Sequence, residues 1–157
     1  MLHRNTYKKR KQLIPYINGF LWTMETLCSD SDHGQTYYVE EIERLQTYEK
    51  SVISHLRDEN YIITIEKIVD WKLQIVGTAK DFFTSAERLR SSRIKIVNFD
   101  SLMELYITLM SELITEKAEV FEVFVNWNNG GFYECYHKDY LVNNDKRLFF
   151  IHFGVTD

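Results

Sequence analysis

The chain has 157 residues, of which 45% are apolar and 27% charged, a balance that argues against a disordered or fibrous protein and favours one domain. Its formal net charge of −4 argues against nucleic acid as a partner, because broad nucleic-acid binding needs an excess of basic residues. The longest apolar runs are far shorter than the roughly 18 residues that a transmembrane helix needs, so the sequence predicts no membrane partner.

Three helices are predicted in the first part of the chain, over about residues 7–28, 36–58 and 61–91. In the first helix, apolar residues from Leu13 to Leu27 recur every three or four positions, as one face of an amphipathic helix requires. The second carries its glutamates opposite its apolar residues. The third is ambiguous, because Tyr61–Ile65 also has the composition of a strand, but its length favours one long bent helix or two shorter ones.

The pattern changes to that of a β-sheet after residue 92. Residues 93–99 alternate apolar and basic side chains, which predicts a strand, and Ser101 with Glu104 forms a capping box for a helix ending near Lys117. Three more strands are predicted over residues 120–127, 132–137 and 147–153. Asn128–Gly131 and Val142–Lys146 have the composition of the turns between them.

These elements predict an α+β fold in a single domain, residues 1–157. A helical half, 1–92, is expected to pack on a β-α-β-β-β unit, 93–157, with a three- to four-stranded antiparallel sheet. We find no internal repeat and no linker rich in Gly, Pro or Ser that would indicate a second domain.

Local motifs of catalysis or cofactor binding are absent from the sequence, so we assign no catalytic residue, no metal ligand and no cofactor. The best metal candidate is Asp30, Asp32 and His33, because two carboxylates two residues apart can bind a hard cation. The further acidic ligands of a calcium loop are missing. We therefore interpret this segment as an ordinary polar loop.

A second candidate is Cys135, His137 and Asp139, which could act as nucleophile, base and orienting acid. On a strand, however, Cys135 and His137 would lie about 6–7 Å apart, too far for direct proton transfer. We therefore interpret this segment as a structural strand. His152, in an aromatic strand, is interpreted as a buried core or interface residue rather than a ligand.

The leading hypothesis from sequence is a non-enzymatic module that binds another protein. Small, acidic α+β proteins without motifs include many inhibitors, immunity proteins and antitoxins, whose partners are basic toxins or enzymes. An acidic helix face or the aromatic surface of the sheet would contact the partner. The expected contact residues are Glu40, Glu41, Glu43, Glu49, Trp127, Tyr133, Tyr136 and Tyr140.

Two alternatives remain open at this point. A small hydrolase or nuclease would use His137 or His33 with nearby carboxylates, and it would show a polar pocket with shifted pKa values. A homo-oligomer joined through the meander of the three C-terminal strands is the other. The two cysteines, Cys28 and Cys135, are far apart in the sequence and show no metal-ligand spacing, which favours a reducing, cytoplasmic location.

Overall fold

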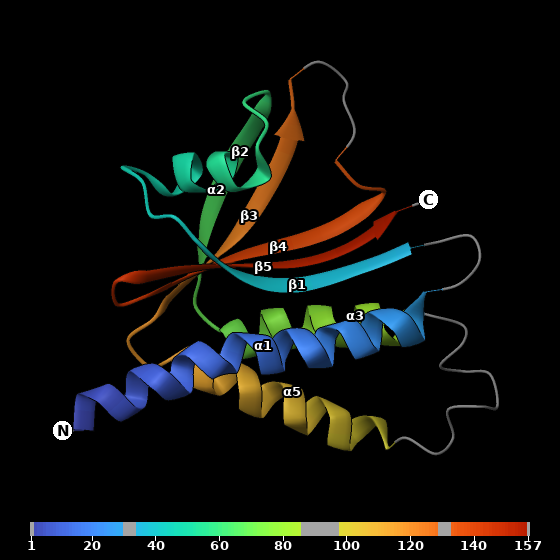
Figure 1. Cartoon of the computed structure of the whole chain (residues 1–157). Coiled ribbons are helices and arrows are strands. Elements are labelled where there is room, and N and C mark those ends of the chain that lie inside the picture. The colour runs from blue at the N-terminus through green and yellow to red at the C-terminus, as the bar shows by residue number, and fades with distance from the viewer. Residues whose placement is uncertain (1, 30–33, 86–97, 129–132, 157) are drawn as a thin grey trace.

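The chain folds into one antiparallel sheet with helices on both of its faces (Figure 1), in a computed structural model that describes residues 2–29, 34–85, 98–128 and 133–156. The strands are β1 (Gly34–Ile42), β2 (Tyr61–Ile68), β3 (Glu119–Trp127), β4 (Tyr136–Asn144) and β5 (Arg147–Thr156). The helices are α1 (Leu2–Cys28), α2 (Tyr48–Leu56), α3 (Gly77–Ser85) and α5 (Phe99–Leu113), with a π-helical turn, η1 (Lys72–Val76), before α3. The predicted α+β class is confirmed.

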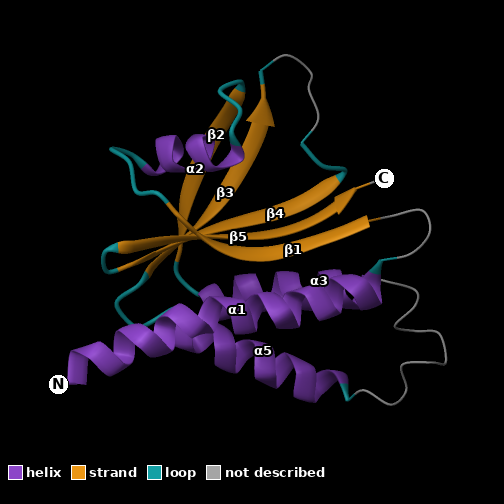
Figure 2. Cartoon of the chain, viewed as in Figure 1, coloured by secondary structure: helices purple, strands orange, loops and turns teal. Residues whose placement is uncertain are grey.

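The sheet has the strand order β1-β5-β4-β3-β2, and every neighbouring pair is antiparallel. It therefore has five strands, more than the three to four expected. Helices α1, α3 and α5 lie together on one face, and α2 lies on the other (Figure 2). No helix in the described ranges is long and apolar enough to cross a membrane.

Helix α1 confirms the first predicted helix and begins earlier, at Leu2. Its apolar stripe is buried on the sheet, as the spacing requires. The buried residues of the stripe are Leu13, Ile17, Leu21, Met24 and Cys28. Pro15 lies inside the helix but on its exposed side.

The helix predicted over 36–58 is wrong in its first part, where residues 34–42 form β1. Tyr37 and Val39 pack into the helical layer, whereas Tyr38 and Ile42 pack on the opposite side of the sheet. Both faces of this strand are therefore covered, and burial of β-branched and aromatic side chains in a sheet outweighs the weak helical pattern.

Helix α2 occupies only the second part of that range. It begins at Tyr48 because Thr47 caps it, accepting a hydrogen bond from the backbone N–H of Lys50 at 3.3 Å. It ends at Leu56, because the next residue, Arg57, adopts a left-handed conformation with φ 60° and donates its backbone N–H to the carbonyl of Ile53.

The helix predicted over 61–91 is wrong for residues 61–68, which form β2 and pair with β3 along their whole length. Tyr61–Ile65 has the composition of a strand, and β3 supplies the hydrogen-bonding partner that a strand needs. The helical spacing of the sequence does not reveal this partner. Helix is confirmed from Lys72 to Ser85, through η1 and α3. Residues 86–91 lie outside the described part of the chain.

The strand predicted over 93–99 lies outside the described residues up to position 97. The prediction is wrong for its last two residues. Asn98 caps α5 by accepting a hydrogen bond from the backbone N–H of Asp100, and Phe99 begins that helix. The helix ends at Leu113, four residues before the expected end. The expected turn at Asn128–Gly131 lies outside the described residues from position 129 on.

Strands β3 and β5 confirm the predictions over 120–127 and 147–153, whereas the strand predicted over 132–137 is wrong for residues 133–135 and confirmed only at Tyr136 and His137, with residue 132 outside the described part of the chain. Strand β4 begins only at Tyr136 and continues to Asn144, through most of the expected turn. It has a partner on each side, and this double pairing outweighs the low strand propensity of its asparagines. The turn is reduced to Asp145 and Lys146, with Asp145 at φ 57°.

The aromatic residues of the C-terminal strands are mostly core. Phe149 and Phe153 pack under α1, α3 and α5, and Phe150 packs on the α2 side with Val52. All three of these phenylalanines are at most 1% exposed. The sheet is therefore not a bare aromatic surface, and the polar residues on its α2 side stand out against an apolar background.

Candidate functional site

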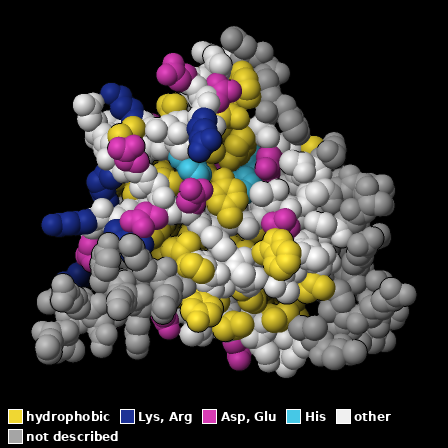
Figure 3. Space-filling view, in the orientation of Figure 1, with side chains coloured by type: hydrophobic (Ala, Val, Ile, Leu, Met, Phe, Trp, Pro, Cys, Tyr) yellow, Lys and Arg dark blue, Asp and Glu magenta, His cyan; other side chains and the backbone are white. Residues whose placement is uncertain are grey.

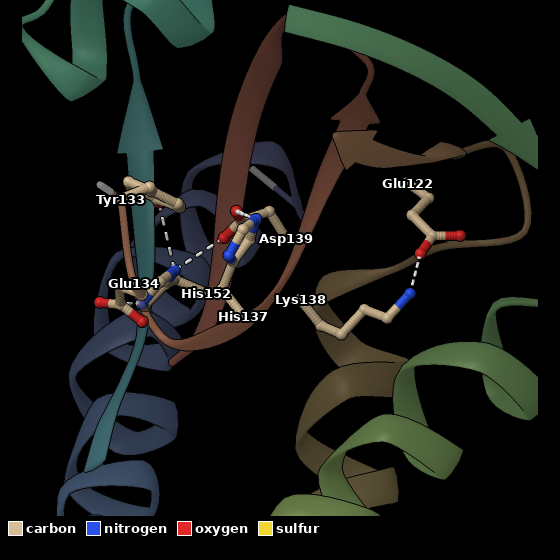
Figure 4. A network of polar contacts seen from close by, with 7 residues as sticks. All are labelled: Glu122, Tyr133, Glu134, His137, Lys138, Asp139 and His152. Carbon is tan, nitrogen blue, oxygen red and sulfur yellow. Dashed lines mark hydrogen bonds and ion pairs between the residues drawn. The ribbon is translucent and has the colours of Figure 1, made fainter. Parts of the chain in front are cut away.

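The candidate site lies on the α2 face of the sheet, where β4 begins and β5 ends. Strand pairing builds its centre, because Tyr38 lies opposite His152 and His152 lies opposite Asp139. Alternate residues of a strand point to opposite faces, so His137 shares this face with Asp139. We call Glu134, His137, Asp139 and His152 the histidine–carboxylate cluster (Figure 4).

His152 is the centre of the cluster and is only 2% exposed. Its Nδ1 lies 2.7 Å from Oδ1 of Asp139, and its Nε2 lies 3.2 Å from Oε1 of Glu134. The hydroxyl of Tyr133 lies 3.4 Å from the same Nδ1. Both ring nitrogens of His152 thus face a carboxylate acceptor, an arrangement that suits the protonated ring.

The two carboxylates determine the charge of His152. Burial lowers its pKa, but hydrogen bonds to Asp139 and Glu134 outweigh burial and raise the pKa of His152 to about 9. Asp139 is fully buried, and burial raises the pKa of its carboxyl group. The pair therefore holds its shared proton tightly, and His152 is a charged, inaccessible residue near neutral pH.

Glu134 reaches His152 because position 154, two residues along β5 on the same face, is a glycine. A Cβ at position 154 would lie 1.6 Å from Oε2 of Glu134 and 2.5 Å from Nε2 of His152. A methyl group there cannot coexist with the contact between these two side chains. Gly154 is therefore required by the close approach of the cluster to the backbone.

Replacing Gly154 with alanine is expected to displace the carboxylate of Glu134, lower the pKa of His152 and destabilise the fold by about 1–3 kcal/mol. Histidine NMR titration and urea unfolding would measure both effects. Gly19→Ala is the matched control, because a Cβ there meets nothing within 4 Å and alanine favours the helix. An unchanged His152 titration in Gly154→Ala would contradict this assignment.

His137 is the accessible member of the cluster. Its side chain is 24% exposed, and its Nε2 lies 4.0 Å from Oδ2 of Asp139. The ring of Tyr133 stands edge-on at 4.7 Å. Burial lowers the pKa of His137 below the ordinary 6.5, so its ring is neutral near pH 7. Oδ2 of Asp139 is buried and accepts no hydrogen bond from the described residues.

His55 approaches the same region from α2. Its ring lies 4.9 Å from that of Phe150 and 6.1 Å from that of Tyr38, which itself stacks on His152 at 4.9 Å. Burial lowers the pKa of His55, and its Nδ1 lies 4.0 Å from Glu40. Figure 3 shows histidine side chains at the surface near the centre of the view, with acidic side chains beside them.

The arrangement combines a neutral, reachable imidazole with a buried carboxylate and a second, charged imidazole. Such a set can accept and return a proton, and perturbed pKa values in one cluster are typical of functional sites. Within the described ranges, no group of three or more His, Cys, Asp or Glu residues is arranged to hold a metal ion.

The four glutamates expected to contact a partner do not share a helix face, which corrects that part of the hypothesis. Glu40 and Glu41 are neighbours in β1 and so point to opposite faces of the sheet. Glu43 follows the strand, and only Glu49 lies in α2. Glu41 accepts two hydrogen bonds from Arg147, at 2.8 and 2.6 Å.

The four expected aromatic contact residues lie in different surroundings. Trp127 is half-buried, and Tyr133 belongs to the surroundings of His152. Tyr136 is 56% exposed. Tyr140 is buried, with its hydroxyl 2.6 Å from that of Thr78, so a partner cannot reach it in this structure.

The remaining sequence candidates separate in the structure. Asp30, Asp32 and His33 lie outside the described residues. Cys135 is exposed and precedes β4, whereas His137 and Asp139 lie in the strand and approach each other. The burial expected for His152 is confirmed, but sequence reasoning missed its two carboxylate partners. The one signal in the sequence was that His137 and Asp139 are two positions apart, so their side chains share one face of a strand.

Comparison of the chain with protein-family models, curated proteins and solved structures found no match. The function therefore has to be argued from the chemistry of the site.

Proposed function

We propose that this chain is a small hydrolase, with the histidine–carboxylate cluster as its acid–base site and His137 as the catalytic residue. The observation that supports it is the position of Asp139 between two histidines. One carboxylate oxygen is bonded to buried His152, and the other is turned toward accessible His137. This gives His137 a buried anion behind it and leaves it open to a substrate.

The roles follow from charge and access. His137 is neutral near pH 7 and can take a proton from water, after which Asp139 would stabilise the imidazolium ring. His152 is inaccessible and acts as a positioning residue, since it holds Asp139 by a hydrogen bond of 2.7 Å. Tyr133, edge-on to His137, limits the orientation of the ring.

In the proposed reaction, His137 accepts a proton from water while the water oxygen attacks a carbonyl carbon or a phosphorus atom. The bond to the leaving group then breaks, and His137 returns the proton to that group. No redox partner is needed. The substrate is therefore an ester, an amide or a phosphodiester, and the last of these corresponds to a nuclease.

The test is hydrolysis of p-nitrophenyl acetate, bis-p-nitrophenyl phosphate and a single-stranded RNA by the purified chain. His137→Gln is expected to lower kcat by about 100-fold or more on the substrate that is turned over. Lys138→Gln is the matched control, because Lys138 faces the other side of the sheet and contacts Glu122 (Figure 4).

The pH dependence gives a second readout of the same proposal. Because burial lowers the pKa of His137, activity should rise with pH and reach half its maximum below pH 6.5. No turnover of any of the three substrates would contradict the proposal. Equal activity of the wild type and His137→Gln would contradict the role of this residue.

A second proposed function is binding of another protein, as an inhibitor or antitoxin would do, in the cytoplasm. It is supported by an apolar groove of about 520 Å³ between α1 and α5, rather than by the acidic residues. Tyr16, on the rim, is 69% exposed, and Leu105 is also exposed. Exposed apolar groups around a groove are typical of protein interfaces.

Capture of partners from native lysate by the tagged chain would test this function. A stoichiometric partner is expected to be retained by the wild type and lost by Leu105→Lys, because a charge in the groove opposes apolar contact. Glu104→Lys, exposed on the neighbouring position of α5, is the matched control. A partner held equally by both variants would exclude the groove.

A further inference from the structure

The two edge strands of the sheet, β1 and β2, differ in the hydrogen bonding of their outer backbone groups. On β1, the side chain of Asn18 donates to the carbonyl of Val39 at 2.9 Å and accepts from its N–H at 2.8 Å. Two further N–H groups of β1 donate to the side chains of Glu25 and Ser29. Side chains of α1 and of Ser29, just after it, thus occupy outer backbone groups of Gln35, Tyr37 and Val39, which opposes the addition of another strand there.

The opposite edge, β2, pairs only with β3. The N–H of Asn128 donates to the carbonyl of Asn60 at 3.3 Å, so residue 60 points toward β3. Backbone groups of alternate residues point to opposite sides of a strand. The groups of Ile63, Ile65 and Lys67 therefore point outward, and no hydrogen bond joins them to the described part of the chain.

Strand β2 contains no proline that would block its edge. Its one lysine, Lys67, has a 61% exposed side chain, and its ammonium group lies 2.6 Å from Glu119 of the neighbouring β3, on the inner side of β2. On the face away from α2, Ile62 is 47% exposed. An open row of backbone groups beside an exposed apolar side chain is a template for strand addition.

We propose that β2 pairs with β2 of a second copy of the chain, antiparallel about a two-fold axis at Thr64. The strand is complementary to itself in this register. Ile63 lies opposite the partner's Ile65, and Tyr61 lies opposite the partner's Lys67. The outward backbone groups of both copies then pair with each other.

Charge excludes two of the alternative registers. An axis at Glu66 or Lys67 would place two like charges directly opposite each other, which is destabilising in a sheet. With the axis at Thr64, Glu66 faces the partner's Ile62, and the exposed isoleucine is covered. Pairing of the two copies removes the remaining open edge of each sheet. This inference is independent of the proposed hydrolase, because β2 carries no residue of the cluster.

The test is cysteine cross-linking in the full chain, with the exposed Cys135 replaced by serine. At a non-hydrogen-bonded pair the two Cα atoms lie about 4.5 Å apart, within reach of a disulfide. Thr64→Cys is therefore expected to give a covalent dimer on mild oxidation. Glu66→Cys is the matched control, since it lies on the same face but not opposite itself. Equal cross-linking by both variants would overturn the proposal.

Sedimentation velocity provides the second measurement. The wild type is expected to form a dimer. Thr64→Glu is expected to raise the Kd of this dimer about tenfold or more, because it places two carboxylates opposite each other at the axis. Thr64 is exposed, so this variant should fold. A wild type that remains monomeric up to about 100 µM, or a dimer unaffected by Thr64→Glu, would overturn the proposal.

Discussion

Replacing His152 with leucine is expected to lower the free energy of unfolding by about 3–5 kcal/mol at pH 7, the cost of leaving a buried charge without its partner. Asp139 is fully buried, and its hydrogen bond to His152 is its closest described contact. Glu134 loses its partner at the same time. Urea unfolding of the wild type and the variant would measure the difference.

A double-mutant cycle separates this loss from a simple change in packing. Asp139→Asn alone should also destabilise the fold, whereas the double variant should be more stable than the sum of the two losses predicts. The reason is that each single change leaves an unpaired group that the second change removes. Additive losses would contradict the buried pair.

The same pair gives stability a defined dependence on pH. The pKa of His152 is raised from 6.5 to about 9, so its stabilising effect is fully present below pH 6.5 and is lost as pH rises through about 9. Unfolding free energy of the wild type should fall by about 3 kcal/mol over this interval. His55 and His137, whose pKa values are lowered, stay neutral there.

The His152→Leu variant is the control for this pH dependence. Its stability should change much less over the same interval, so the gap between variant and wild type should narrow at alkaline pH. A gap that stays constant from pH about 6.5 to about 9.5 would show that His152 does not titrate as its contacts imply.

Replacing Phe153 with alanine is expected to cost about 3–5 kcal/mol, because the variant leaves a cavity where the sheet meets the helical layer. Phe153 is fully buried in β5. Its ring lies 5.7 Å from that of Tyr37 in β1, 5.6 Å from that of Phe82 and 6.3 Å from that of Phe83 in α3. It therefore joins three elements that are distant in the sequence.

Urea unfolding of Phe153→Ala would measure this cost, with Tyr136→Ala as the matched control. Tyr136 also stacks on Phe82, at 5.1 Å, but its side chain is mostly exposed. Its removal should cost less than about 1 kcal/mol. A similar loss from both variants would mean that the core does not depend on Phe153.

The sequence determined the elements whose pattern is local. The apolar stripe of α1 and the β-branched and aromatic runs of β3 and β5 each depend on neighbouring residues, whereas α5 is capped by Asn98 and not by the predicted box of Ser101 and Glu104. Helical or strand spacing reports such elements, because the buried face follows from the period of the pattern. The α+β class could be predicted for the same reason.

Only the tertiary structure decided that the residues of β1 and β2 form strands, because their sequences also have helical spacing. Both became strands because a partner strand far along the chain supplies their hydrogen bonds. The extension of β4 to Asn144 has the same cause, since β3 and β5 pair with it from both sides.

The candidate site likewise could not be predicted from local sequence patterns. Tyr38, Asp139 and His152 form one row only because β1 pairs with β5 and β5 with β4 in a particular register. A shift of one residue would turn His152 to the opposite face of the sheet. The sequence determined which residues could do chemistry, and strand register, a property of the whole sheet, decided which of them meet.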